Sequence, residues 1–446
     1  MKGIASLPSS VCSRYNKGMS KFQIALLGMF GFFIVTAVAV FALYKGSSAT
    51  QAVVTVWGTL PAGEMNSILA NSPVFIQDSS LTIRYTEKKA STITDDFTEA
   101  LAQGNGPDVI ILPQDTLWQS RNKLAQIPYN SISEGDFMDA FVEGGEVFLS
   151  PTGIYALPLL VDPLVLYYNR DLLSTAGIAK PLAYWDEVYA ATTNLTRRDA
   201  AGNIVQSTIS LGETKNILNA KDIISLLLIQ AGSSITELSG TSLRSTLAQS
   251  FNLPVSPAIS AFDFYTQFAN PSKSFYSWNR SLPEAQSAFA AGESAYYVGF
   301  ASELPIIRSK SPTRNFSVAS VPQSRVGSAS ATYGTFYAAA ISRGTKNMTA
   351  ALAALVKLSS KDAAEALSGA FALPPARRDL LSVKQTDSTG PVFYASALQA
   401  RAWLDPNAAG TEKIFTNTID AILSGRLRTN EAVNAAHSQI EDLISK

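Results

Sequence analysis

The sequence predicts an α/β fold that follows one membrane-spanning helix. The helix is predicted by residues 22–44, an apolar stretch without a charge that is long enough to cross the hydrocarbon of a bilayer. The α/β fold is predicted beyond residue 51, where apolar and β-branched runs alternate with amphipathic stretches. The chain length of 446 residues allows two or three domains with a large core.

Basic residues before the apolar stretch set the expected orientation of the helix. They are Lys2, Arg14, Lys17 and Lys21, whereas only Lys45 follows before the first acid, Glu64. This excess predicts a cytoplasmic tail (1–21), a single-pass anchor (22–44), a linker (45–51) and an extracellular or periplasmic remainder. The alternative is a cleaved secretory signal with a weak small-residue site at 47–49.

The elements of the outer body can be read in order from hydrophobic periodicity. Strand-like runs occupy residues 52–57, 81–85, 108–112, 155–168, 294–298 and 316–321. Helical patterns occupy residues 93–101, 185–195, 220–230 and 348–370, and two more helices are expected in 410–446 with a break near Ser424 and Gly425. Asp108 begins a buried strand, so we expect its carboxylate to hydrogen-bond nearby backbone instead of a ligand.

Composition excludes several classes of function. Cys12 and His437 are the only cysteine and histidine, so the sequence offers no multi-histidine or multi-cysteine metal site. A Ser–His–Asp triad would depend on His437, which lies in a polar stretch typical of a solvated helix, so a triad is not expected. The 35 basic and 35 acidic residues balance, and the anchor region holds five of the basic ones, which leaves a mildly acidic body. We therefore expect no cofactor, no metal and no nucleic-acid partner.

Several strings occur together in one order. They are YALPLLVDPLVLYYNRDLLSTAGIAKPLAYWDEVYAATTNLT at 155–196, GNGPDVIIL at 104–112 and FAAGESA at 289–295. In these strings the chain resembles the extracellular solute-binding proteins of ABC importers, the sugar-binding family 1 that includes the maltose-binding type. The resemblance covers nearly all of 52–446. One departure is PLAYW at 181–185, where Pro-Pro-x-Thr-Trp is usual, but that segment only begins a helix.

The resemblance implies a type II periplasmic-binding-protein-like fold with two hinged lobes and a discontinuous chain. The chain would cross between lobes near 161–163, 318–322 and 370–375. The first lobe would contain 52–161 plus 323–372, and the second 162–318 plus 376–446. A ligand would lie in the cleft, and the lobes would close on it by hinge motion.

A carbohydrate presents hydroxyl groups and apolar C–H faces, so its site needs carboxylate acceptors and aromatic rings. Asp115 follows Asp108 by the spacing at which the maltose-binding member carries a hydroxyl-binding carboxylate. Asp162 matches an acidic residue at the hinge of that member. Glu412 stands approximately where family members place an aromatic platform, so stacking would be lost there and a more polar or different ligand favoured.

Aromatic candidates complete the expected site. Trp57 ends the first strand, at the rim where open α/β sheets bind ligands. Tyr155, Trp278, Phe300 and Tyr333 are further candidates, the last beside Gly334 in a small-residue run that reads as flexible. For each of these aromatics the competing interpretation is packing in the core.

The sequence thus predicts a monomeric, membrane-anchored receptor, and not an enzyme, that captures a sugar or oligosaccharide and delivers it to ABC permease subunits. One alternative is a surface sensor or adhesive module of the same fold without transport. Another is a glycoside hydrolase with paired carboxylates, which needs neither histidine nor cysteine.

Overall fold

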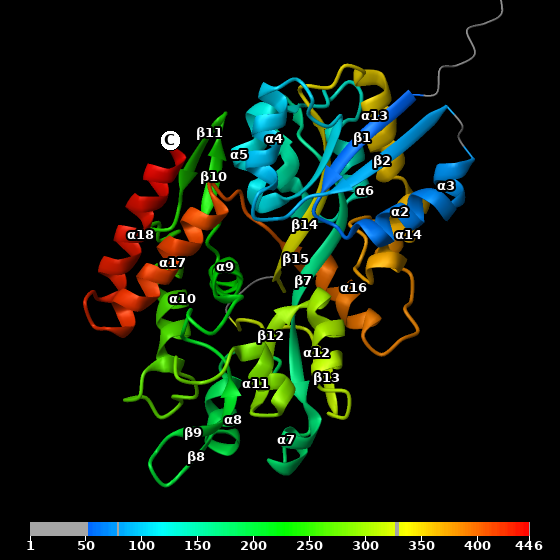
Figure 1. Ribbon diagram of the computed structural model, residues 1–446. Coiled ribbons are helices and arrows are strands. Elements are labelled where there is room, and N and C mark those ends of the chain that lie inside the picture. The colour runs from blue at the N-terminus through cyan, green and yellow to red at the C-terminus, as the bar shows by residue number, and fades with distance from the viewer. Residues whose placement is uncertain (1–51, 78–79, 326–329, 446) are drawn as a thin grey trace, which may run out of the picture. The chain divides into compact units, whose positions relative to one another are not determined.

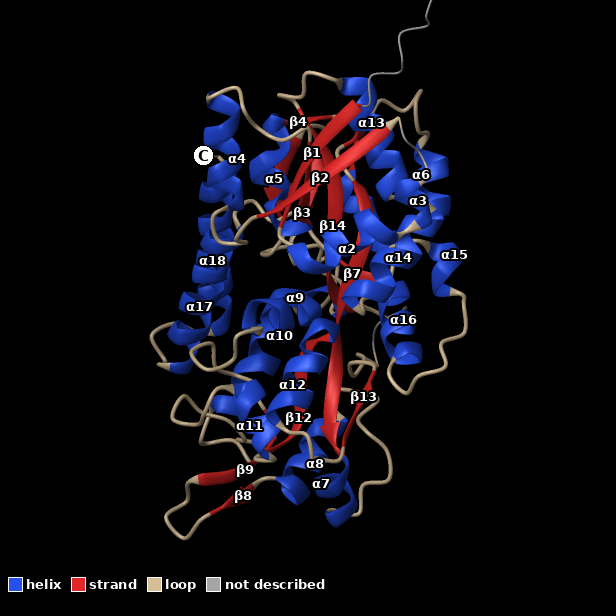
Figure 2. Ribbon diagram, turned by 45° about the vertical axis from the view of Figure 1, so that its right-hand side comes forward, coloured by secondary structure: helices blue, strands red, loops and turns tan. Residues whose placement is uncertain are grey.

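The computed structural model describes residues 52–77, 80–325 and 330–445 (Figure 1). The predicted anchor at 22–44 lies outside these residues, and no helix within the described ranges is long and apolar enough to cross a membrane. Eleven of the described strands form one sheet, with the central order β2-β1-β3-β14-β7-β12-β9-β8. Helices pack around this sheet (Figure 2), which confirms the α/β class.

The strands of the sheet come from distant parts of the chain. They are β1 (Ala52–Gly58), β2 (Leu81–Glu87), β3 (Val109–Pro113), β4 (Leu124–Ala125), β7 (Leu157–Asn169), β8 (Arg197–Arg198), β9 (Ile204–Ile209), β12 (Ser294–Phe300), β13 (Phe316–Ala319), β14 (Thr332–Ser342) and β15 (Ala400–Arg401). Two small hairpins lie apart from it, β5 (Leu149–Ser150) with β6 (Gly153–Ile154), and β10 (Thr236–Ser239) with β11 (Ser242–Ser245).

Strand β7 joins two groups of strands. Its first part pairs with β14, which continues through β3 to β1 and β2, and its second part pairs with β12 and β13. Nearly all of its thirteen residues are buried, as expected of a continuous apolar run. Pro158 and Pro163 lack an N–H, and the register with β14 shifts opposite Pro158.

The helices pack around the two groups of strands (Figures 1 and 2). Around β1–β3 lie α2 (Ala62–Asn71), α3 (Pro73–Ile76), α4 (Ile93–Ala102), α5 (Leu117–Ser120), α6 (Glu134–Ala140), α13 (Met348–Leu358) and α14 (Lys361–Phe371). With β9 and β12 lie α7 (Arg170–Thr175), α8 (Glu187–Leu195), α9 (Ala220–Gln230), α10 (Pro257–Thr266), α11 (Ala285–Ala291) and α12 (Leu304–Lys310). The remaining helices are α15 (Arg378–Leu381), α16 (Gly390–Gln399), α17 (Ala408–Leu423) and α18 (Thr429–Ile444), of which α17 contacts α9 and α18 contacts α10.

Most predicted elements are confirmed with small shifts of boundary. The helix predicted at 220–230 is α9, and the first strand is one residue longer than predicted. The Ala-rich stretch 348–370 is two helices, because Ser360 ends the first and its hydroxyl caps α14 by accepting from Ala363. The sequence analysis did not predict β14, whose first residues lie in the small-residue run that reads as flexible.

The expectation for Asp108 is also confirmed. Its carboxylate accepts hydrogen bonds from the Thr55 backbone N–H at 2.9 Å and from the hydroxyls of Thr55 and Thr345 at 2.8 and 2.7 Å. The residue therefore ties the beginning of β3 to β1 and to the segment after β14.

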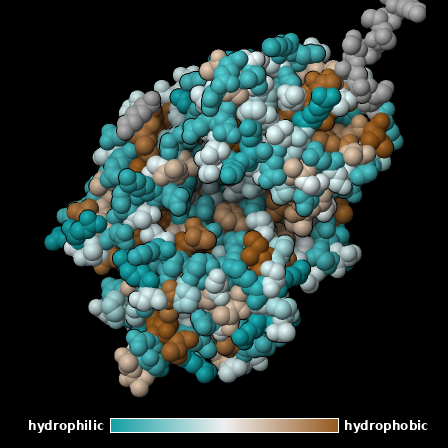
Figure 3. All heavy atoms as spheres, viewed as in Figure 1, coloured by the Kyte–Doolittle hydropathy of each residue, from teal (hydrophilic) through white to brown (hydrophobic). Residues whose placement is uncertain are grey.

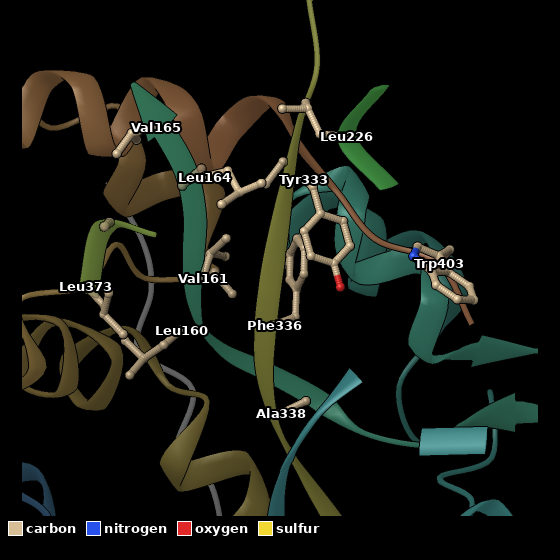
Figure 4. Close-up of a cluster of buried hydrophobic side chains, with 14 of the residues drawn as sticks. Leu160, Val161, Leu164, Val165, Leu226, Tyr333, Phe336, Ala338, Leu373 and Trp403 are labelled. Atoms are coloured by element: carbon tan, nitrogen blue, oxygen red, sulfur yellow. The ribbon is translucent and has the colours of Figure 1, made fainter. Parts of the chain in front are cut away.

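The core is densest where β7 and β14 run side by side. Figure 4 shows Val161 and Leu164 of β7 beside Tyr333 and Phe336 of β14, with Trp403 beyond them. Val161 also donates its N–H to the carbonyl of Pro374 at 2.9 Å, so the first and third predicted crossings lie side by side. On the face seen in Figure 3, hydrophobic residues are interspersed among hydrophilic ones.

Candidate functional site

The turn after β3 fixes the position of Asp115. Residues Gln114–Thr116 form a 3-10 turn directly after the strand. The amide of the buried Gln114 donates to the Tyr333 hydroxyl at 3.1 Å and accepts from the Phe336 N–H at 2.6 Å. These two bonds tie the end of β3 to β14, so the next side chain, that of Asp115, is held beside the β7–β14 junction.

Asp115 carries an unused acceptor. Its Oδ1 atom is buried and accepts no hydrogen bond from any residue that the structure describes. Burial raises the pKa of this carboxyl, and nearby Asp405 raises it further, whereas Lys221 lowers it. A buried acceptor without a donor is costly, so this oxygen is suited to a donor from a ligand.

Lys221 and Asp405 form the central ion pair of the site. Lys221 Nζ, at the beginning of α9, lies 2.6 Å from Asp405 Oδ2, and the two side chains are 10% and 1% exposed. Asp405 also accepts from the Thr411 hydroxyl at 2.7 Å and from the Asn407 N–H at 2.9 Å. Burial alone would lower the pKa of Lys221, but the carboxylates around it outweigh burial and raise it.

Two further carboxylates complete the group. Asp222 follows Lys221, and burial raises its pKa to about 7, with Asp115 and Glu412 contributing in the same direction. Glu412 is an exposed residue of α17. We refer to Asp115, Lys221, Asp222, Asp405 and Glu412 as the acidic cluster.

Aromatic rings border the acidic cluster. Tyr333 is 2% exposed, and its pKa is raised by burial and by the carboxylates of the cluster. Its ring meets that of Phe300 edge-on with centroids 6.5 Å apart. Trp403 lies 5.7 Å from Lys221 Nζ, measured to the ring centroid, and donates its indole N–H to the Ser225 hydroxyl at 3.1 Å.

Asp162 of β7 lies near the segment that follows Phe300, because it is hydrogen-bonded to Ser302. It is 4% exposed, it pairs with Thr335 across β7 and β14, and its Oδ1 accepts the N–H of Ser302 at 3.0 Å. Burial raises its pKa to about 7 in spite of that hydrogen bond. Ser302 lines a cavity of about 580 Å³ between the start of α12 and the segment that follows α14.

The structure brings only some of the predicted site residues together. Asp115, Tyr333 and Glu412 lie in or beside the acidic cluster, and Phe300 adjoins it through the ring of Tyr333. Asp162 is bonded to Ser302, which follows Phe300 closely in the chain. The remaining three are in other places.

Trp57 is a half-buried residue of β1 whose ring is covered by Lys88 Nζ, 4.0 Å from the ring centroid. Tyr155 lines a separate cavity of about 100 Å³ with Trp118 and Arg121. Trp278 is 1% exposed and donates its indole N–H to Asn216 at 3.0 Å, so its ring packs in the core.

Sequence reasoning missed Lys221, Asp222, Asp405 and Trp403. The signals were weak: Lys221 and Asp222 look like the ordinary first turn of a helix, and Asp405 precedes a helix in a way that is typical of capping. Within the described ranges, no three His, Cys, Asp or Glu side chains are placed to hold a metal ion.

Comparison with known proteins identifies the family of the chain. A family model described as "Bacterial extracellular solute-binding protein" matches residues 75–390, more than half of the chain. The maltodextrin-binding protein of Bacillus subtilis is 31% identical over 107 residues, which is 23% of this chain and 24% of that protein. The galactooligosaccharide-binding protein of the same species is 25% identical over 122 residues, 27% and 28% of the two chains.

These sequence matches are local. Binding proteins of Brucella match over 118 residues at 26% identity, so the chain spans about a quarter of the length of the curated relatives that it matches.

Solved structures match over the whole body. A cyclo/maltodextrin-binding protein complexed with maltotetraose has a TM-score of 0.72 at 15% identity, with 90% of this chain and 99% of that chain covered. The cyclic α-maltosyl-1,6-maltose binding protein of Arthrobacter globiformis has a TM-score of 0.71 at 17% identity and covers 88% and 99%. The fold is therefore the two-lobe periplasmic-binding-protein-like fold, as the sequence predicted. Because the family model covers more than half of the sequence, the chain belongs to the bacterial extracellular solute-binding proteins, which bind solutes and are not enzymes.

Proposed function

We propose that the chain is a receptor that captures a sugar or oligosaccharide at the acidic cluster and its aromatic border, and delivers it to the permease of an ABC importer. We also propose that residues 22–44 anchor it to the membrane with the binding body outside. The observation that carries the choice of site is the buried Oδ1 atom of Asp115, which accepts no hydrogen bond from the described residues. A sugar hydroxyl is a donor of the right size for such an oxygen.

The surroundings of Asp115 support the same assignment. Asp222 and Glu412 add acceptors, while the partly buried Phe300 adds apolar surface against which C–H faces of a sugar can pack. Tyr333, which is 2% exposed, supports the Phe300 ring from the core side. The ligands named for the relatives, maltodextrin and galactooligosaccharide among them, are carbohydrates. Trp57 and Tyr155 stay predictions as outer contacts, whereas Trp278 would act only through the packing of the core.

The place of the cluster in the fold supports the proposed role in transport. The cluster joins residues from the turn after β3 with residues from α9 and α17, so a ligand that contacts Asp115 and Glu412 would bridge the two groups of strands. Such a ligand would stabilise the closed arrangement, because it makes more contacts with the protein when the two groups of strands are close together. A permease that binds only the closed form would then distinguish the loaded receptor from the free receptor.

Calorimetric titration of the purified full chain in detergent tests the ligand class. We expect saturable binding of at least one member of a panel of mono- and oligosaccharides, with the sugar recovered chemically intact. Absence of binding across the panel by a folded protein would refute the carbohydrate assignment. Affinity purification of a permease with the sugar-loaded receptor, and not with the free receptor, tests delivery.

A further inference from the structure

The acidic cluster has an unbalanced charge. It holds four carboxyl groups, Asp115, Asp222, Asp405 and Glu412, and the single ammonium of Lys221. Lys221 is already engaged by Asp405 and by the carbonyl of Ala408 at 3.2 Å. Carboxyl groups therefore outnumber the single cation by three where the proposed ligand lies, and a further cation there would favour their ionised forms.

The remaining carboxylates are short of donors. Among the described residues, no side chain donates a hydrogen bond to Asp115, Asp222 or Glu412, whereas Asp405 is satisfied by Lys221, Thr411 and Asn407. Asp115 and Asp222 are half-buried, and each disfavours ionisation of the other. Buried like charges are tolerated when a cation or several donors join them.

Lys221 shows that the surroundings accept an ammonium group. Its Nζ atom is nearly enclosed, with one carboxylate, one carbonyl and the face of Trp403 around it. Asp115 and Asp222 both lie close enough to Lys221 to raise its pKa. A second ammonium on their open side would meet the same kind of partners, whereas a neutral hydroxyl supplies one donor and no charge.

A metal ion fits this group less well. The carboxylates of the described residues are not gathered tightly enough for three of them to ligate one ion. An organic cation is better matched, because its donors point in different directions from one carbon-bound nitrogen.

We propose that the ligand is a saccharide with a free amino group, whose ammonium lies among Asp115, Asp222 and Glu412. This inference rests on the proposed carbohydrate function and specifies the chemical class of its ligand. It predicts that an amino sugar binds more tightly than the sugar that has a hydroxyl or an acetamido group at the same carbon.

Calorimetry of the full chain with matched pairs tests it at pH 7. The pairs are glucosamine and glucose, galactosamine and galactose, and chitosan oligomers against cello-oligomers and N-acetylated chito-oligomers of equal length. For at least one pair we expect the amine to bind about tenfold or more tightly than its neutral partners, and we expect added salt to reduce that preference. Equal or weaker binding of every amine would overturn the inference while leaving the carbohydrate function intact. Absence of binding by any sugar would overturn both.

Variants separate a specific site from general attraction to an acidic protein. Asp222→Asn and Glu412→Gln each remove one ionisable carboxyl group, and the exposed Glu412 can change without disturbing the core. We expect either variant to lower the ratio of amine to neutral affinity several-fold. The matched control Asp139→Asn removes an exposed charge from α6 and should leave the ratio unchanged. An equal effect of the control would overturn the assignment to the cluster.

Discussion

Asp162 makes the stability of this protein depend on pH in a predictable direction. The side chain is 4% exposed and accepts one backbone N–H, from Ser302. Burial raises its pKa from an ordinary 3.8 to about 7. Below about pH 4 the carboxyl is protonated in both the folded and the unfolded chain, and between about pH 4 and 7 only the unfolded chain ionises it. The free energy of unfolding therefore falls as the pH rises through this window, and the loss is complete above about pH 7.

The variant Asp162→Asn isolates this contribution, because an amide oxygen can still accept from Ser302. Between pH 5 and pH 7 one group loses at most about 1.4 kcal/mol per pH unit, and less as the pH approaches its pKa, so wild type should lose about 2 kcal/mol that the variant keeps. Asp222, whose pKa is also raised to about 7, contributes equally to both proteins and cancels in the comparison.

Urea unfolding at pH 5 and pH 8 measures the difference. The stability of Asp162→Asn relative to wild type should rise by about 2 to 4 kcal/mol between the two pH values. The exposed control Asp139→Asn should show no such rise. If Asp162→Asn and wild type lose the same stability between pH 5 and pH 8, the carboxyl is ionised in the folded protein and the reasoning from its burial is wrong.

Three other substitutions probe the site and its support. Asp115→Ala should weaken sugar binding by about 1 to 3 kcal/mol in calorimetry, because it removes the unpartnered oxygen that meets the ligand; unchanged affinity would remove Asp115 from the site. Lys221→Met leaves Asp405 buried and unpaired, so it should lower stability by about 3 to 5 kcal/mol in urea, whereas Lys180→Met at an exposed position should not. Trp278→Phe leaves Asn216 without its donor and should cost about 1 to 3 kcal/mol of stability with the sugar Kd unchanged. A large change in Kd would place Trp278 in the site after all.

The fold was predictable from sequence where a pattern is strong and local. The apolar run of β7 is confirmed because a strand that is buried on both faces needs a continuous apolar stretch. The helical stretch 93–101 is confirmed as α4 because a helix that is buried on one face repeats its apolar residues about every four positions. Strand β14 escaped prediction because Gly334 and its small neighbours look like a loop. In the structure Gly334 packs against Ala400 and Val161, where a larger side chain would crowd the β7–β14 junction.

The candidate site was predictable only in part, for the same physical reason. Asp115 became a candidate through the family resemblance, by its spacing after Asp108, and the short segment between the two residues makes that spacing a local feature. Lys221 and Asp405 are far apart in the chain and meet only when α9 and α17 pack together. Nothing in either segment taken alone distinguishes a buried ion pair from an ordinary helix beginning.

The place of β14 in the sheet has a consequence for biogenesis. It lies between β3 and β7 in space but follows both in the chain. Until residue 342 has left the ribosome, β3 has no neighbour on one side and the strands before β7 cannot join it. Pairings that close such long stretches of chain form slowly. A newly made chain would thus keep its two groups of strands unjoined until β14 has been made, late in its synthesis.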